Sequence, residues 1–383
     1  MNLKELLHPV PVSEILDAAD RNEVFHRRRS AASACDSLMN WDIAAHIAER
    51  KGSQLGELRI LRDGVEVRQE MLRTSRNSAQ FSGAALRRLV RQGVSFVGAG
   101  IEDFSPALRD LRFDAERHFG CPTSLGMIAT FGKGHALKPH WDPEDIICVQ
   151  VAGRKTWKIL GKPCDGTIGT TDRKLAPPTE VTREFTMEQG DLMMIPRGHW
   201  HCCESDVDNL QFSILLQRRM GLHFIQHLTE LVQRDPLFHR AVPLSRDPAR
   251  FAIFEAEWLA RFQELARPGA LQRFIESGDR SAEIPFCFDR TPPDLCDPGA
   301  VLTLAARRPI APPEAPGEPL RMGGVTIQTT PAILAVVELL NREVSMEASE
   351  VFQRLASSYA RDEIATAILA LDDSCVARLW KPG

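Results

Sequence analysis

The sequence of 383 residues predicts an α+β protein with a mainly β core, which we expect to be an antiparallel barrel or jelly roll. Three observations predict this. Short strand-like runs follow one another between residues 125 and 216. Beyond Arg219 the strand pattern gives way to apolar residues at helical spacing. A proline-rich stretch then precedes a tail with a helix-helix-helix-strand pattern.

The part of the chain before the core, residues 1 to about 120, mixes short helical and strand patterns. Ala85–Gln92 predicts a helix that leads into a short strand, GVSFVG. Phe104 to Phe119 predicts another helix, because Leu108, Leu111 and Phe113 are among its apolar positions. The strand core begins only after this mixed region.

The core itself is predicted from runs separated by Gly, Pro, Asp and Asn, which favour turns. The runs are SLGMIATF, DIICVQVAG, KTWKIL, REFTM, DLMMIP and LQFSILLQ. Short strands in this succession are typical of an antiparallel barrel or jelly roll. We assign residues 1–218 to this domain.

Residues 219–290 predict a helical region. Its large apolar residues at helical spacing are Leu222, Ile225, Leu228, Val232, Phe254, Trp258, Phe262 and Leu265. They are more than an isolated pair of helices would bury, so we expect a self-association surface and a homodimer.

Residues 291–383 predict a linker followed by a small domain. The stretch 291–320 holds eight prolines, which predict a linker or an irregular wrap. Helices are then predicted at Pro331–Asn341, Met346–Ala356 and Arg361–Leu371, with a strand at Cys375–Trp380, a pattern typical of a winged helix. From Leu320 onward six Lys and Arg residues stand against eight Asp and Glu residues, which argues against direct DNA binding and favours a packing or protein-docking module.

The whole-chain composition is that of a soluble globular protein, with 43% hydrophobic and 26% charged residues. The net charge of −4 gives no general attraction to nucleic acid or to a membrane. The first residues contain no long apolar run, so neither a signal peptide nor a membrane span is expected. Nine cysteines without a CxxC pair favour reduced thiols in a cytoplasmic protein, and adjacent Cys202 and Cys203 are interpreted as a strand pair on opposite faces.

The candidate metal site begins at Pro139-His140-Trp141-Asp142. Residues i and i+2 of an extended chain point to the same face, so His140 and Asp142 can offer an imidazole and a carboxylate to one metal. A second histidine from a distant strand would complete a set of two His and one carboxylate. That set suits non-haem Fe(II) and leaves positions open for a cosubstrate and O2.

Two histidines compete for the third position. His199 falls within the turn that follows Pro196, whereas His201 opens the next strand. We favour His201 as the ligand and interpret His199 as a residue at the rim of the substrate entrance, or merely an exposed one. His223 and His227 are also spaced like a helical metal pair, but no third ligand is near them in sequence. The run that begins at His26 is interpreted as a solvated charge run.

The segments PHWDPEDIICVQVAGRKTWKIL and GDLMMIPRGHWH resemble JmjC-domain, cupin-like proteins of the ribosomal-oxygenase type. RQGVSFVGAGIEDFSPALRDL resembles the family's approach to its first core strands. The resemblance implies a double-stranded β-helix that binds Fe(II) and 2-oxoglutarate. It also implies hydroxylation of an unactivated C–H bond, usually on a protein side chain, and a dimerisation module followed by a C-terminal module.

The resemblance further implies residues for the cosubstrate. In Gly153-Arg154-Lys155-Thr156-Trp157, the position matching the family's 2-oxoglutarate cation is Lys155. A dianion bound beside a metal needs a cation at its far end, and only one of Arg154 and Lys155 can face the barrel interior. Polar positions expected near the cosubstrate are Gln211, Ser213 and Thr130, whereas Asp145 matches a structural position.

Departures from the family limit what is carried over. Pro143-Glu144 stands where many relatives have an aromatic residue, and the single tyrosine, Tyr359, lies in the tail. We therefore expect an oxygenase acting on a protein or peptide substrate and leave its identity open, including the choice between hydroxylation and demethylation. One alternative is the same chemistry on a small molecule or biosynthetic peptide. Another is a regulator or scaffold with a ligand-sensing barrel.

Overall fold

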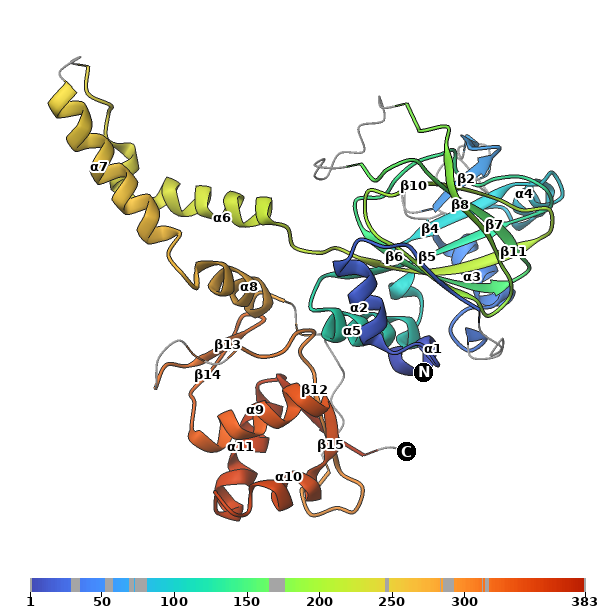
Figure 1. Cartoon of the computed structure of the whole chain (residues 1–383). Helices are drawn as coiled ribbons and strands as arrows, with labels where there is room; N and C mark the ends of the chain where they lie inside the picture. Colours follow the sequence, from blue (N-terminus) through green and yellow to red (C-terminus); the bar gives the residue numbers. More distant parts are fainter. Residues whose placement is uncertain are drawn as a thin grey trace. The chain divides into compact units, whose positions relative to one another are not determined.

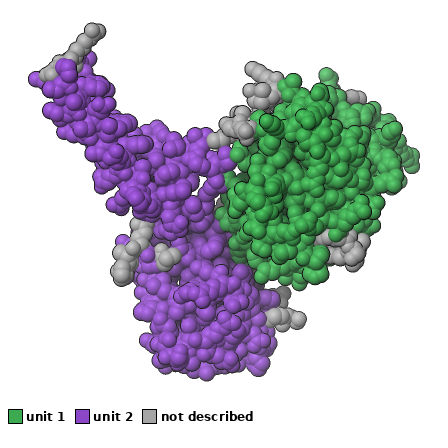
Figure 2. Space-filling model, in the orientation of Figure 1, with its two compact units in different colours: residues 1–218 green, residues 219–383 purple. Residues whose placement is uncertain are grey.

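The computed structural model describes residues 2–28, 35–51, 58–68, 72, 81–164, 176–244, 248–282, 284, 293–311, 313 and 317–381. The chain divides into two compact units, Met1–Arg218 and Arg219–Gly383. Figure 1 traces the chain through both units, and Figure 2 colours unit 1 green and unit 2 purple. Each unit has a hydrophobic core of its own.

Unit 1 is built on a large antiparallel sheet whose strands run in the order β1-β9-β6-β11-β5-β4-β2-β3. Its strands are β1 (Phe25–Arg27), β2 (Leu58–Arg62), β3 (Val65–Glu66), β4 (Ser95–Ala99), β5 (Thr123–Thr130), β6 (Asp145–Ala152), β9 (Leu192–Ile195) and β11 (Asn209–Leu216). The central strands are almost continuously buried, because side chains on both of their faces are covered.

A smaller antiparallel sheet, in the order β10-β7-β8, covers one face of the large sheet. Its strands are β7 (Lys155–Leu160), β8 (Val181–Met187) and β10 (Trp200–Glu204). Buried side chains from both sheets, such as Cys148 and Met193 of the large sheet and Trp157 of the small one, form a common core. Two antiparallel sheets packed in this way make the predicted jelly roll.

Helices cover the other face of the large sheet (Figure 1). They are α1 (Leu3–Leu7), α2 (Val12–Asp20), α3 (Trp41–Lys51), α4 (Gly83–Val90) and α5 (Pro106–Phe119), with a 3₁₀ turn at Ile101–Phe104. In α5 the sequence encodes both ends: the Ser105 hydroxyl accepts from the Leu108 backbone N–H, Pro106 occupies the first turn, and Gly120 ends the helix with φ 63°.

The predicted elements of unit 1 correspond closely to this structure. The helix expected at Ala85–Gln92 is α4, the strand after it is β4, and Phe104–Phe119 contains α5. Each of the predicted core runs contains a strand. The strands β1, β2 and β3 were not predicted separately. They have two to five residues, and β1 and β3 form the two edges of the sheet.

Unit 2 begins with helices and ends in a small α/β core. Its elements are α6 (Gly221–Arg234), a 3₁₀ turn (Pro236–His239), α7 (Pro248–Leu265), α8 (Ala270–Arg280), β12 (Val301–Leu304), β13 (Leu320–Met322), β14 (Val325–Ile327), α9 (Pro331–Glu343), β15 (Ser345–Glu347), α10 (Ala348–Leu355), α11 (Arg361–Asp373) and β16 (Ala377–Trp380).

The three helices and closing strand predicted for the tail are present, with one difference. Met346 and Glu347 belong to the strand β15, not to the following helix. The proline-rich stretch also differs from a plain linker, because it contains β12, the central strand of the sheet β15-β12-β16. Leu302 and Leu304 of β12 are fully buried in the core of unit 2, so these alternating apolar residues hold the stretch in place.

The helical part of unit 2 leaves much apolar surface exposed. No residue of α7 is buried, and α6 buries only Leu228. Trp258 of α7 stacks on Phe262 and meets Phe238 edge-on, but its side chain remains partly exposed. In the described part of the chain no helix is both long enough and apolar enough to span a bilayer.

Candidate metal centre

The structure brings His140, Asp142 and His201 together inside the jelly roll. One possible ligand atom from each residue lies within 4.8 Å of the others, and this is the one such group of three or more found among the described residues. The Asp142 Oδ2 atom lies 3.7 Å from His140 Nε2 and 3.4 Å from His201 Nε2. A mutual backbone pairing of His140 with His201 joins the loop before β6 to the start of β10.

Backbone carbonyls orient both imidazoles. His140 Nδ1 lies 2.7 Å from the Lys138 carbonyl oxygen, and His201 Nδ1 lies 2.9 Å from the His199 carbonyl oxygen. Each contact requires Nδ1 to carry the proton, so each Nε2 offers its lone pair toward Asp142. Burial, together with the nearby His140, lowers the pKa of His201 to about 4, which keeps this imidazole neutral and able to bind a metal.

The three side chains differ in exposure, so one side of the site is closed and the other is open to solvent. His201 is almost completely buried at 4%, whereas His140 and Asp142 are exposed at 29% and 24%. Two His and one carboxylate on one side leave the opposite side open for further ligands. The donor set therefore fits a non-haem iron centre with an accessible face.

Lys155 lies on β7, on the same inner face as Trp157 and Ile159, and Ile159 pairs with His201. The Trp157 ring lies between the side chains of Lys155 and His201, 5.6 Å from the His201 ring and 5.8 Å from Lys155 Nζ. Lys155 is only 2% exposed. Its neighbour Arg154 points the other way and pairs with Asp206 in solvent, so Lys155 is the inward-facing cation, as alternation along a strand requires.

The partner of this buried ammonium is neutral. Lys155 Nζ donates to Gln211 Oε1 at 3.0 Å, and Gln211 Nε2 donates to Ser213 Oγ at 3.0 Å and to Cys148 Sγ at 3.2 Å. Burial raises the pKa of Cys148 to about 12, so this thiol is neutral too. A positive charge thus lies inside the jelly roll against a chain of uncharged polar groups.

A cavity of about 140 Å³ joins these groups to the metal ligands. It is lined by His140, Asp142, His201, Gln211 and Ser213, and otherwise almost entirely by apolar side chains. The metal cluster and the polar chain therefore share one mostly apolar chamber, with Lys155 behind Gln211.

Two expectations from the sequence are wrong about position. His199 is not at the rim and not exposed: it is buried, and its Nε2 is 3.1 Å from the Asn22 carbonyl oxygen, because the turn after Pro196 packs against the N-terminal segment. Thr130 is buried but does not line the cavity. Its Oγ1 accepts a hydrogen bond from the Ser95 hydroxyl. His223, which is not part of the metal cluster, is half-buried and accepts from the Met220 N–H, so it caps its helix.

Some residues of the chamber were not singled out from the sequence. Trp157, Cys148 and Cys203 all line it. Alternation along β6 puts Cys148 on the face of Ile146, and alternation along β10 puts Cys203 on the face of His201. The signal was present, but using it requires knowing which face is internal. Cys202 lies on the opposite face from Cys203, as the sequence predicted.

Comparison with known proteins gives this geometry a family context. Residues 104–223 match the model of the JmjC domain. A "Bifunctional lysine-specific demethylase and histidyl-hydroxylase NO66" of Brugia malayi is 30% identical over 111 residues, covering 27% of this chain and 16% of the relative. "Ribosomal oxygenase 1" of Bos taurus is 23% identical over 323 residues, covering 78% of this chain and 47% of the relative.

Solved structures give the same result for the fold. The X-ray structure of E. coli ycfD aligns with a TM-score of 0.58 at 16% identity, over 97% of this chain and 98% of that one. A structure of YcfD, described as a ribosomal oxygenase, in complex with cobalt and 2-oxoglutarate aligns with a TM-score of 0.55 at 15% identity. The chain spans less than half the length of the two curated relatives above.

Proposed function

We propose that unit 1 is an Fe(II)- and 2-oxoglutarate-dependent oxygenase of the JmjC ribosomal-oxygenase type, which hydroxylates a protein or peptide side chain. The match to the JmjC domain and the similarity to ribosomal oxygenases support this proposal. One observation carries the proposal. Lys155 is a buried cation that donates to a neutral amide, Gln211, in the same jelly roll as a His-Asp-His cluster. A buried charge is costly unless it is paired, so this arrangement favours an anionic ligand.

The metal would be held by His140, Asp142 and His201. Their donor set suits Fe(II), and the backbone contacts of both Nδ1 atoms fix the rings before the metal arrives. The burial of His201 anchors one side of the site. The greater exposure of His140 and Asp142 leaves the other side for the substrate to approach.

The 2-oxoglutarate dianion would extend from the metal toward Lys155, with its distal carboxylate accepting from Nζ. Gln211 can keep its hydrogen bond to Lys155 while the two other ammonium protons turn to the carboxylate. Ser213 accepts a hydrogen bond from the Gln211 amide nitrogen, so the side-chain carbonyl oxygen of Gln211 stays directed at Lys155. Thr130 is left out of this set because of its position.

When bound, Fe(II) with 2-oxoglutarate and O2 supplies the oxidising chemistry: one oxygen atom enters a substrate C–H bond, the other enters succinate, and CO2 is released. This chain's own contribution is to orient the ligands and to keep water away from the reacting atoms. Val97, Ile128 and Leu215 are among the apolar walls of the chamber that serve the second purpose.

A protein or peptide substrate is supported by the relatives, whose names describe a histidyl-hydroxylase and a ribosomal oxygenase. The residue modified by this chain is not carried over from them, because Pro143-Glu144 departs from the family beside the metal ligands. We propose a cytoplasmic location, because the nine cysteines are odd in number and form no CxxC pair, a pattern that favours reduced thiols.

We also propose that residues 219–290 form a homodimer interface and that the tail is a winged-helix-like docking module. Ile253 is 63% exposed on α7, and Ile225 is 52% exposed on α6, so both helices present apolar surface to solvent. A second copy of the same helices would cover it. Light scattering coupled to size exclusion should show a dimer that Ile253→Asp weakens and that Gln263→Asp, a control on the same helix, leaves intact.

The experiment for the oxygenase itself measures succinate formed from 2-oxoglutarate by the full chain with Fe(II) in air. We expect turnover that His140→Ala abolishes, and mass spectrometry of candidate proteins and peptides should reveal a gain of one oxygen atom that depends on enzyme and cosubstrate. Binding of 2-oxoglutarate without any turnover would instead support a ligand-sensing regulator. Turnover stimulated only by small molecules would show that the substrate is a small molecule and not a protein or peptide.

A further inference from the structure

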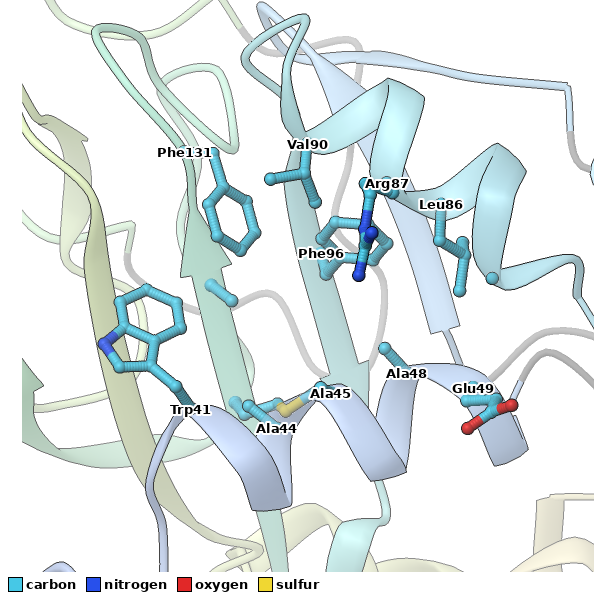
Figure 3. A pocket seen from close by; sticks show the side chains of 13 residues that line it. Trp41, Ala44, Ala45, Ala48, Glu49, Leu86, Arg87, Val90, Phe96 and Phe131 are labelled. Carbon is cyan, nitrogen blue, oxygen red and sulfur yellow. The ribbon is translucent and has the colours of Figure 1, made fainter.

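A second cavity, of about 450 Å³, lies between the large sheet and the helices α3 and α4 (Figure 3). Its sheet wall is made by Phe96 of β4 and Ala129 of β5, which face each other in register. The next pair along these strands, Val97 and Ile128, lines the metal chamber. Neighbouring strand residues point to opposite faces, so the two cavities lie back to back across the same two strands.

The cavity exists because α3 presents small side chains to the sheet. Ala44 and Ala48 face the sheet across a space that a larger residue would fill. At one end Trp41 and Phe131 pack with their ring centroids 5.4 Å apart, and Phe96 meets Phe131 edge-on. An aromatic-walled concavity of this size lies within the range of pockets that bind small molecules.

The other end of the cavity carries one charge of each sign. Glu49 comes from α3 and Arg87 from α4, and Figure 3 shows both at the side away from Trp41. Both residues are exposed, and among the described residues no hydrogen bond or ion pair involves the side chain of either one. The lining is therefore apolar at one end, and at the other end it carries one negative and one positive side chain.

We propose that this cavity binds a small zwitterion with an aromatic body, of the kind represented by a free aromatic amino acid. The ring would lie against Trp41, Phe96 and Phe131, with the carboxylate facing Arg87 and the ammonium group facing Glu49. A ligand with a single charge satisfies only one of the two residues and is repelled by the other. The site is separate from the metal chamber, so its occupation needs neither iron nor 2-oxoglutarate.

Four probes that share an indole ring test the proposal: L-tryptophan, tryptamine, indole-3-propionate and indole. Their binding to the full chain, without iron or 2-oxoglutarate, is measured by calorimetry or by saturation-transfer NMR. We expect L-tryptophan to bind most tightly. Arg87→Gln should weaken L-tryptophan and indole-3-propionate by about fivefold, the size of one exposed ion pair, and should not weaken tryptamine. Glu49→Gln should weaken L-tryptophan and tryptamine instead.

Two further variants control the design. Ala48→Leu fills the cavity and should abolish binding of every probe while the melting temperature is kept or raised. Arg88→Gln changes the next arginine of α4, which does not line the cavity, and should have no effect. The proposal is overturned if the wild-type chain binds none of the probes, if all four bind equally, if Arg88→Gln acts like Arg87→Gln, or if folded Ala48→Leu still binds.

Discussion

Replacing Lys155 with methionine removes a buried cation that faces the interior near the metal ligands and keeps most of the side-chain volume. The ammonium group of Lys155 is buried and donates to Gln211, so the change deletes one charge and leaves one amide oxygen without this donor. Replacing a buried charge by an apolar group of similar size is usually tolerated by the fold. We therefore expect the variant to fold with a melting temperature close to that of the wild-type chain.

The effect on 2-oxoglutarate binding should be much larger. Without Lys155, the distal carboxylate enters a mostly apolar chamber with only neutral polar groups to receive it. Breaking one partner of a buried charge pair costs about 3–5 kcal/mol, which corresponds to a loss of roughly two to four orders of magnitude in affinity. Fe(II) binding should change little, since Lys155 is not among the residues of the metal cluster.

The assay is an anaerobic titration of the Fe(II)-loaded protein with 2-oxoglutarate, followed by its charge-transfer absorption. Arg154→Met is the matched control, because Arg154 is the adjacent residue and its side chain pairs with Asp206 in solvent. We expect the control to bind within about twofold of the wild-type chain. A Lys155→Met affinity within about fivefold of wild type, or an equal loss in the control, would refute the assignment of Lys155.

Three more predictions follow from the same geometry. Gln211→Glu puts a carboxylate 3.0 Å from Lys155 Nζ with almost no change in side-chain shape. It should therefore weaken the binding of 2-oxoglutarate by roughly 100-fold. An unchanged affinity in the same anaerobic titration would contradict this. Asp142→Ala should remove the charge-transfer band and reduce Fe(II) affinity by more than about 100-fold, measured by competition with a chelator. Burial lowers the pKa of His26 from 6.5 despite its hydrogen bond to Asp191, so the unfolded chain takes up this proton first as the pH falls. The stability that His26 contributes should therefore be full above pH 6.5 and should decrease as the pH falls below that value. Urea unfolding should show a smaller decrease for His26→Gln, and an equal decrease would contradict the role of His26.

Local patterns were sufficient for most elements of this fold. The strand runs of the core carry apolar residues between turn-forming residues, and each run contains a strand in the structure. The metal ligands were also identifiable, because a spacing of two on an extended chain places His140 and Asp142 on one face. The same alternation showed that only one of Arg154 and Lys155 can face the interior, and the family resemblance selected Lys155. These features depend on neighbours in sequence, which is why they can be read without a structure.

Other features depend on contacts between distant segments. His199 could not be placed from its turn alone, since the partner of its ring is the backbone of Asn22, far away in sequence. Thr130 was expected near the cosubstrate, and its bond with Ser95 could be seen only once β4 and β5 were paired. The strand β12 was not predicted within the proline-rich stretch. It is buried by helices and strands of the tail, which are distant from it in sequence.

The sequence by itself determined an antiparallel barrel or jelly roll, from its succession of short strands, and placed His140 and Asp142 on one face by alternation along an extended chain. The resemblance to a known family, and not alternation, selected Lys155 as the inward-facing cation. Only the tertiary structure decided what those residues meet. It placed Gln211, Ser213 and Cys148 in a neutral chain beside Lys155, and it opened a second cavity behind the same strands. The physical reason is that packing and register join residues across the whole chain, and no local pattern specifies which distant side chains will share a space.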